Sequence, residues 1–214
     1  MYRYVLFDLD GTLTDPWEGI TRCVQFALER FGIEETQENL TTFIGPPLRE
    51  SFATRYGMSE EEAEAAVAAY RERFAACGLY ENRVFDGVAD LLARLREAGV
   101  VIALATSKPE EFARIILDHF ALTPYFDVIA GASMDTGRMR KDQVIEEALR
   151  RLDGPRPNEV VMVGDRVHDI EGARAFGIET IAVSWGYAPE GELETAKPAQ
   201  IADTLDELEQ LLLA

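Results

Sequence analysis

The sequence predicts an α/β protein with a doubly wound parallel sheet and an all-helical segment inserted after the first strand. Three observations predict this class. Short apolar runs alternate with helical patterns, as in parallel sheets with crossover helices. Most of these runs are unbroken, as expected for strands covered on both faces. The alternation stops between Pro16 and Phe85, where helical patterns occur without a convincing strand.

Apolar runs are the expected strands of the sheet. The first is Tyr4–Phe7, which ends abruptly at Asp8. One later run is interrupted by Asp127, so it is a less regular strand than the others. In chain order the later runs are Val100–Ala105, Phe126–Ala130, Val160–Val163 and Thr180–Val183.

Helical patterns separate these strands. Asp86 is a candidate N-cap for a helix through Ala98, and Pro109 stands at the start of the next one. Lys141 opens the helix before the strand Val160–Val163. Helical patterns also cover 145–152, 170–176 and 204–213.

The insert at 16–85 is expected to form a domain of its own, while 1–15 and 86–214 form the α/β core. A helix over 16–31 is closed by Gly32, and a second over 48–56 is closed by Gly57. Ser59-Glu60-Glu61-Glu62 has the spacing of a capping box and opens a third helix.

The composition excludes several classes of protein. With 21 Lys and Arg against 39 Asp and Glu, the net charge is −18. The chain has no basic run, so nucleic acid and anionic membranes are not expected partners. An anionic small molecule would need a local positive site such as a metal ion. Cys23 and Cys77 make no disulfide framework, and we expect both to be reduced and buried. With no leader and no membrane span evident, the predicted location is the cytoplasm.

Polar residues stand where the predicted strands end. Ligands of open parallel sheets bind beyond the carboxyl ends of the strands, so these residues should share one edge. They are Asp8-Leu9-Asp10-Gly11-Thr12 after the first strand, Thr106-Ser107 after the second, Gly164-Asp165 with Asp169 after the fourth, and Lys141.

This edge would gather several carboxylates, one Lys and two hydroxyl residues. Carboxylates in one pocket repel each other and stay ionised together only beside a cation. Hard oxygen ligands in small number suit Mg²⁺, which completes its shell with water and substrate phosphate. A hydroxyl, a Lys and loop N–H groups can hold phosphoryl oxygens. The pattern favours phosphate chemistry with Mg²⁺.

These motifs, in this order, resemble the four motifs of the haloacid dehalogenase superfamily, and the insert resembles its helical cap domain. The resemblance spans essentially the whole chain and implies a Rossmann-like core. Within the superfamily, the chain is most similar to the phosphoglycolate-phosphatase-like branch and to its members named 5′-nucleotidases. The stretches that carry this similarity are Phe43–Leu48, Ala105–Pro109, Gly164–Ile170 and Trp185-Gly186-Tyr187.

The resemblance implies a role for each motif. Asp8 would be the nucleophile that forms an aspartyl-phosphate, and Asp10 would protonate the leaving oxygen and then deprotonate water. Superfamily dehalogenases and phosphonatases lack Asp at the position of Asp10, so its presence favours phosphate-ester chemistry. Mg²⁺ would lie among Asp8, the backbone carbonyl of Asp10 and Asp165, with Asp169 in support.

The transferring phosphoryl group would also have ligands of its own. Thr106 and Lys141 would stabilise its charge, and Gly11, Thr12 and Ser107 would add further contacts. Lys108 is expected at the surface, with reach toward a substrate. In the insert, Arg49 follows the rigid turn Gly45-Pro46-Pro47 and is the candidate substrate contact.

The predicted function is Mg²⁺-dependent hydrolysis of a small phosphorylated metabolite, by a monomer or a small homo-oligomer. Phosphoglycolate, a 5′-nucleotide and a sugar phosphate all stay open as substrates. One alternative is a phosphomutase, which would release an isomeric sugar phosphate instead of free phosphate. The other is a non-catalytic phospho-receiver, which also gathers Asp, Thr and Lys at strand ends but is shorter and lacks a large helical insert.

Overall fold

The computed structural model describes residues 2–134 and 137–214. The chain divides into two compact units. We call the first the core unit, formed by Met1–Asp15 and Val84–Ala214, and the second the helical unit, formed by Pro16–Arg83.

The core unit contains a six-stranded sheet in which all neighbouring strands are parallel. Its order is β5-β4-β1-β6-β7-β8, so the order reverses at β1, where a ligand-binding crevice is expected in a doubly wound fold. The strands are β1 (Tyr4–Phe7), β4 (Val101–Pro109), β5 (Val128–Ala132), β6 (Val160–Gly164), β7 (Glu179–Val183) and β8 (Gln200–Ala202).

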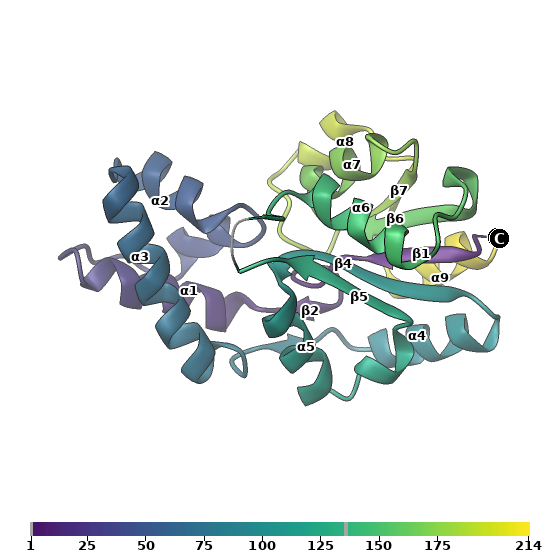
Figure 1. Ribbon diagram of the computed structural model, residues 1–214, viewed down its shortest axis with the longest axis horizontal. Helices are drawn as coiled ribbons and strands as arrows, with labels where there is room; N and C mark the ends of the chain where they lie inside the picture. Colours follow the sequence, from purple (N-terminus) through teal and green to yellow (C-terminus); the bar gives the residue numbers. More distant parts are fainter. Residues whose placement is uncertain (1, 135–136) are drawn as a thin grey trace. The chain divides into compact units, whose positions relative to one another are not determined.

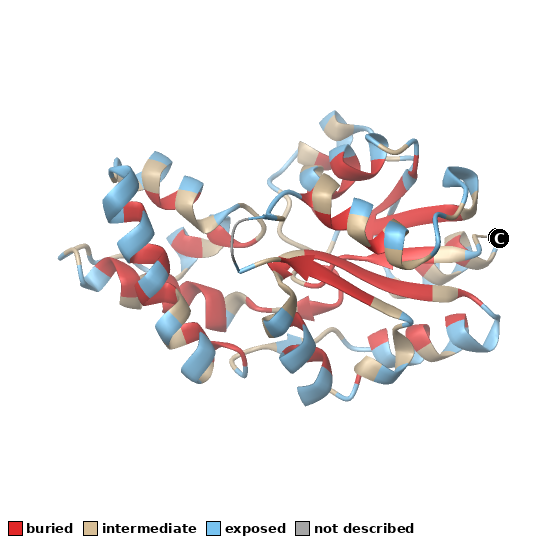
Figure 2. Cartoon of the chain, viewed as in Figure 1, coloured by how far each residue is buried: buried red, intermediate tan, exposed pale blue. Residues whose placement is uncertain are grey.

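Helices cover both faces of this sheet, which confirms the predicted fold class. Figure 1 shows α6 and α7 on one face and α4 and α5 on the other. The strands between them are largely buried, as Figure 2 shows. On the α6 side, Leu6 and Met162 of the sheet pack against Val144 and Ile145. The helices are α4 (Val88–Glu97), α5 (Glu110–His119), α6 (Lys141–Arg151), α7 (Val167–Arg174), α8 (Glu192–Ala196) and α9 (Leu205–Leu213).

The helical unit is built on α1 (Trp17–Glu29), α2 (Leu48–Tyr56) and α3 (Glu60–Arg73), with α1 and α2 both packed against α3. The predicted capping box is present: the Ser59 hydroxyl accepts from the N–H of Glu62, and the Glu62 carboxylate accepts from the N–H of Ser59. Gly57 ends α2 with a φ of 65°. A 3₁₀ helix (η1, Glu38–Phe43) and a π-helical turn (η2, Phe74–Gly78) complete the unit.

Two short strands, β2 (Thr14–Asp15) and β3 (Arg83–Val84), form a separate two-stranded sheet. Both cysteines are free, as predicted, but only Cys23 is buried; Cys77 is half-buried, so that part of the prediction is wrong. No helix in the described part of the chain is long and apolar enough to span a bilayer.

Some predicted boundaries are wrong, for identifiable reasons. The strand predicted at Phe126–Ala130 begins at Val128, because Asp127 instead exchanges hydrogen bonds with the backbone of Ile102. Asp86 does not cap α4; Gly87 occupies the N-cap position with a φ of 92°. The edge strand β8 was not predicted.

Candidate active site

The first site loop is a tight turn at the end of β1. The N–H of Asp8 donates to the Val163 carbonyl at 2.9 Å, which continues the β1–β6 pairing to this residue. Beyond it, the Leu9 carbonyl accepts N–H groups from Thr12, Leu13 and Thr14. Gly11 has a φ of 84°, a conformation that L side chains rarely adopt. The turn therefore fixes where Asp8 and Asp10 leave the strand.

Asp165, the first residue after β6, is fully buried between two glycines. A Cβ on Gly11 would lie 2.2 Å from its Oδ2, and a Cβ on Gly186 would lie 2.3 Å from its Cβ. The Tyr187 N–H donates to Oδ2 at 2.7 Å, and the Thr12 hydroxyl donates to Oδ1 at 3.3 Å. These contacts hold the Asp165 carboxylate in one orientation.

Asp169 lies in the first turn of α7, beside the end of β6. Its Oδ2 accepts the N–H of Arg166 at 3.0 Å. A Cβ on Gly164 would lie 2.2 Å from its Cγ, so only glycine lets this side chain pack against the strand end.

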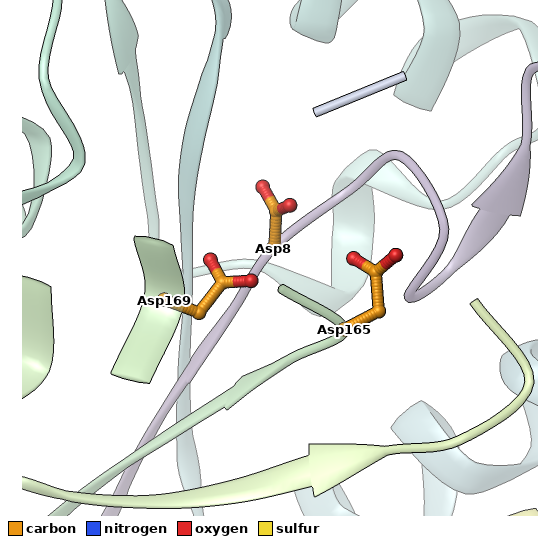
Figure 3. A group of neighbouring side chains, drawn as sticks. All are labelled: Asp8, Asp165 and Asp169. Carbon is orange, nitrogen blue, oxygen red and sulfur yellow. The ribbon is translucent and has the colours of Figure 1, made fainter. Parts of the chain in front are cut away.

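Three carboxylates meet at this edge of the sheet, as Figure 3 shows. Asp8, Asp165 and Asp169 are all buried, and each offers an oxygen within 4.8 Å of the others. Burial raises the pKa of Asp165 well above its usual range, and Asp169 and Asp8 add to the effect by charge repulsion. Burial also raises the pKa of Asp169, although Lys141 opposes it. A cation bound among the three carboxylates would offset this repulsion.

Lys141 is the buried ammonium that faces two of these carboxylates. Its Nζ lies 2.8 Å from Oδ1 of Asp8 and 2.6 Å from Oδ1 of Asp169, and it donates to the Ala105 carbonyl at 3.0 Å. Burial acts to lower the pKa of Lys141, but Asp169 and Asp8 outweigh it and raise the pKa. The group is therefore held protonated.

A second buried lysine corrects the sequence prediction. Lys108, expected at the surface, is only 8% exposed, and its Nζ lies 2.6 Å from Oδ2 of Asp10. The prediction is wrong because an irregularity in β4 redirects this residue. Burial raises the pKa of Asp10, and the charge of Lys108 opposes the rise.

The charges of the cluster suit a divalent cation. Four carboxylates and the two ammonium groups of Lys108 and Lys141 leave a formal charge of −2. Buried Arg166 does not alter this balance, because it pairs with Glu192. Asp8, Asp165 and Asp169 are the residues that could hold such an ion, since all three offer hard oxygen ligands.

The remaining predicted residues of the core unit lie around this cluster. Thr106 is buried near the end of β4, and its hydroxyl accepts the Lys108 N–H at 3.2 Å. Ser107 is half-buried. The N–H groups of Gly11 and Thr12 are used inside the turn, with Thr14 and Leu9 as acceptors. Their contribution to phosphate binding stays a prediction.

Arg49, in α2 of the helical unit, has its partners within that unit. Its side chain is 41% exposed and forms ion pairs with Glu64 and, at 3.6 Å, with Glu60. The structure describes this unit by itself, so the predicted substrate contact of Arg49 stays a prediction.

Sequence reasoning missed two parts of the site. One is Lys108, whose signal was its place directly after Thr106-Ser107. The other is the loop after β7, in which Trp185 donates from Nε1 to the Thr12 carbonyl at 3.2 Å and Tyr187 contacts Asp15 through its hydroxyl. The amino-acid sequence alone does not reveal that Gly186 lies against Asp165.

Comparisons with known proteins identify the family. The model of the haloacid dehalogenase-like hydrolase family matches residues 5–183. A 5′-nucleotidase of Pseudomonas aeruginosa is 47% identical over 212 residues, covering 99% of this chain and 96% of that protein. The tyrosine-protein kinase PtkA of Mycobacterium tuberculosis is 46% identical over 213 residues, covering 98% of this chain and 72% of that protein.

A solved structure shares the fold over the whole length. It is the crystal structure of a predicted phosphatase from Clostridium acetobutylicum, with a TM-score of 0.95 and 42% identity, covering 100% of this chain and 99% of that one. With the family model spanning most of the residues, the chain belongs to the haloacid dehalogenase-like hydrolase family.

Proposed function

We propose that this chain is a magnesium-dependent phosphatase that hydrolyses a small phosphomonoester through an aspartyl-phosphate on Asp8. The observation that carries the proposal is the buried cluster of Asp8, Asp165 and Asp169, with Lys141 between Asp8 and Asp169. Of the substrates left open by the sequence, a 5′-nucleotide is our first choice, because a relative that matches nearly the whole chain is named a 5′-nucleotidase.

In the first step, a carboxylate oxygen of Asp8 attacks phosphorus while the bond from phosphorus to the leaving oxygen breaks. Asp8 suits this role because a carboxylate is ionised at neutral pH and needs no base to activate it. The leaving oxygen takes a proton from Asp10, whose side chain lies next along the turn. The products of this step are the aspartyl-phosphate and a free alcohol.

In the second step, water attacks the same phosphorus and Asp10 removes its proton. The bond between phosphorus and Asp8 breaks, and inorganic phosphate is released. Asp8 and Asp10 return to their starting states, so protons and atoms balance over the cycle.

The other core residues orient and stabilise the phosphoryl group. Lys141 is held protonated beside Asp8, where its charge offsets the negative charge of the phosphoryl oxygens. Thr106 and Ser107 supply hydroxyl groups at the same strand end. Asp8, the Asp10 carbonyl and Asp165 would hold Mg²⁺, with Asp169 in support. The bound ion would supply Lewis-acid stabilisation of phosphoryl charge.

We propose that the helical unit acts as a cap. The support is its place in the chain, because it is inserted as one segment between Asp15 and Val84. A cap that covers the site excludes bulk water and limits the size of the substrate. Arg49 is the cap residue proposed to contact the leaving group.

The test is a phosphatase assay with Mg²⁺ on 5′-nucleotides, phosphoglycolate and a sugar phosphate, combined with rapid acid quench of phosphorus-labelled substrate. We expect labelled protein in the wild type and none in Asp8→Asn. Turnover without any labelled intermediate would contradict covalent catalysis on Asp8. An isomeric sugar phosphate among the products would identify a mutase instead.

A second candidate function follows from the relative named a tyrosine-protein kinase. A kinase would pass the phosphoryl group from ATP to a tyrosine hydroxyl instead of to water. The same assay distinguishes the two when ATP and a tyrosine-containing protein are added. Labelled tyrosine would favour the kinase, and free phosphate alone favours the phosphatase.

A further inference from the structure

We propose that Lys108 is a positioning residue for proton transfer: it holds Oδ2 of Asp10, so that Oδ1 alone exchanges the proton with the leaving group and with water. This inference rests on the proposed function, in which Asp10 is the general acid and base. It assigns a role to a residue that lies outside the four sequence motifs.

The ion pair distinguishes the two oxygens of Asp10. Nζ of Lys108 lies 2.6 Å from Oδ2, and the side chains are 4% and 14% exposed. Oδ1 is also buried, yet it accepts no hydrogen bond from any residue in 2–134 or 137–214. One oxygen is thus fixed by a charge, and the other is open to a reacting group.

The backbone of β4 is built to place Lys108 there. Along the β4–β5 pairing, Thr106 pairs with Gly131 but Pro109 pairs with Ala132, so Ser107 and Lys108 form a bulge. Bulges near active sites commonly redirect a side chain. Here the Thr106 hydroxyl accepts the Lys108 N–H at 3.2 Å and holds the bulge in place.

The bulge fits against β5 because residue 131 is a glycine. A Cβ at Gly131 would lie 2.7 Å from the Lys108 carbonyl oxygen and 2.6 Å from Cα of Glu110. Any larger residue would therefore push the β4 backbone away from β5 and move Lys108. The backbone position of Lys108 is thus set by the two strands β4 and β5.

The composition of the chain also singles out this residue. Only 3 of the 21 basic residues are lysines, and two of those three, Lys108 and Lys141, are buried in the site. The other basic residues are 18 arginines and the exposed Lys197. A compact ammonium makes a point contact with one carboxylate oxygen, whereas a guanidinium tends to engage both. Lysine is therefore the basic residue that leaves Oδ1 of Asp10 open.

The two proton transfers can then use the same atom. When Asp10 carries its proton on Oδ1, Oδ2 is the carbonyl oxygen and still accepts from Lys108. After Oδ1 has given the proton to the leaving oxygen, the carboxylate keeps the same contact. Oδ1 then takes the proton of the attacking water. The side chain does not have to rotate between the two steps.

Leaving-group dependence provides the test. We would measure kcat/KM on phosphate esters of 4-nitrophenol, phenol and a primary alcohol for wild type, Lys108→Met, Asp10→Asn and the double variant. An alkoxide needs a proton to depart, whereas 4-nitrophenolate departs without one. We expect Lys108→Met to lose about 100-fold or more on the alkyl ester and less than about tenfold on the nitrophenyl ester.

The double variant and a surface control complete the design. If Lys108 acts through Asp10, the double variant is no slower than Asp10→Asn alone. Lys197→Met, at an exposed position, should match wild type on all three esters. Circular dichroism and the Tm check folding, and Lys108→Gln replaces Lys108→Met if the latter does not fold.

Two results would overturn the inference in different ways. Equal losses for Lys108→Met on the three esters, with a steep dependence for Asp10→Asn, would place Lys108 on the phosphoryl group or in a structural role. Equal losses for Asp10→Asn itself would remove the acid role of Asp10, and the inference with it.

Discussion

The N–H of Tyr187 donates to Oδ2 of Asp165 at 2.7 Å, which joins the loop after β7 to the loop after β6 at the centre of the site. Between them, Gly186 lies so close to Asp165 that it has no room for a side chain. The loop after β7 thus orients a proposed metal ligand, although it contains none itself.

Gly186→Ala is therefore expected to weaken Mg²⁺ binding by about tenfold or more and to cost about 1–3 kcal/mol of stability through overpacking. Isothermal titration with Mg²⁺ and chemical unfolding measure the two effects. Gly191→Ala is the control for Mg²⁺ affinity, because its Cβ would meet nothing within 4 Å; its φ of 76° means that alanine there also costs stability. Unchanged Mg²⁺ affinity in Gly186→Ala would show that the Asp165 position is not critical.

Asp8→Asn is expected to lower kcat at least 1000-fold, about 4 kcal/mol of barrier, because an amide cannot replace the carboxylate as nucleophile. The Tm should change little or rise, since one buried charge is removed. A steady-state assay and a thermal melt provide the data. Retention of more than about a tenth of kcat would count against covalent catalysis there.

Removal of divalent metal by EDTA is expected to abolish activity, and Mg²⁺ should restore it. Because the cluster has a net negative formal charge, Mg²⁺ should also stabilise the folded protein and raise its Tm. At a Mg²⁺ concentration about 100 times the Kd, the free energy of unfolding should rise by about 2.7 kcal/mol. The same titration on Asp165→Asn should show a much smaller rise. Full activity in metal-free buffer would contradict the magnesium site.

Glu147→Gln should destabilise the core unit by about 1 kcal/mol at pH 7, because Glu147 is only partly exposed and forms ion pairs with Arg150 and Arg151. Hydrogen bonds from Arg150 and Arg151 hold the pKa of Glu147 down, to about 2. A carboxyl whose pKa is lower in the folded state than in the unfolded state stabilises the fold at pH values above its unfolded-state pKa, which is near 4.5 for Glu147. The difference between variant and wild type should therefore shrink as the pH falls from about 4.5 to about 2.

Chemical unfolding at several pH values measures this difference. Glu146→Gln, at the exposed neighbouring position, is the matched control and should stay near wild type throughout. A Glu147→Gln deficit that persists unchanged at low pH would mean that packing, not charge, accounts for it.

Arg49→Ala should change kcat/KM unequally across a nucleotide, a sugar phosphate, phosphoglycolate and an uncharged aryl phosphate, because cap residues meet the leaving group. The largest loss is expected for anionic or polar leaving groups. Glu64→Gln, which removes an ion-pair partner but keeps Arg49, should leave the ranking of substrates unchanged. A uniform effect of Arg49→Ala would end its assignment as a specificity contact.

The sequence predicted the layout of the site because parallel strands place their carboxyl ends at one edge. Asp8 stands more than 150 positions before Asp165 and Asp169, and the three meet there as this rule requires. Lys108 could not be placed in the same way, because a bulge changes the direction of a side chain without changing the pattern of apolar residues in the sequence of the strand. The strand β8 was missed because it has only three residues and its Ile201 is 38% exposed. So short and exposed a strand has no run of apolar residues from which it could be predicted.

The order of the sheet also has a consequence for synthesis on the ribosome. Within residues 2–134 and 137–214, the sheet partners of β1 are β4 and β6, so the strand that leads into Asp8 is made first and is paired only after Val101–Pro109 has been translated. Meanwhile Pro16–Arg83 emerges as one continuous segment with its own apolar interior. During translation, the helical unit can therefore fold before the core unit. While the helical unit folds, β1 stays unpaired in the nascent chain.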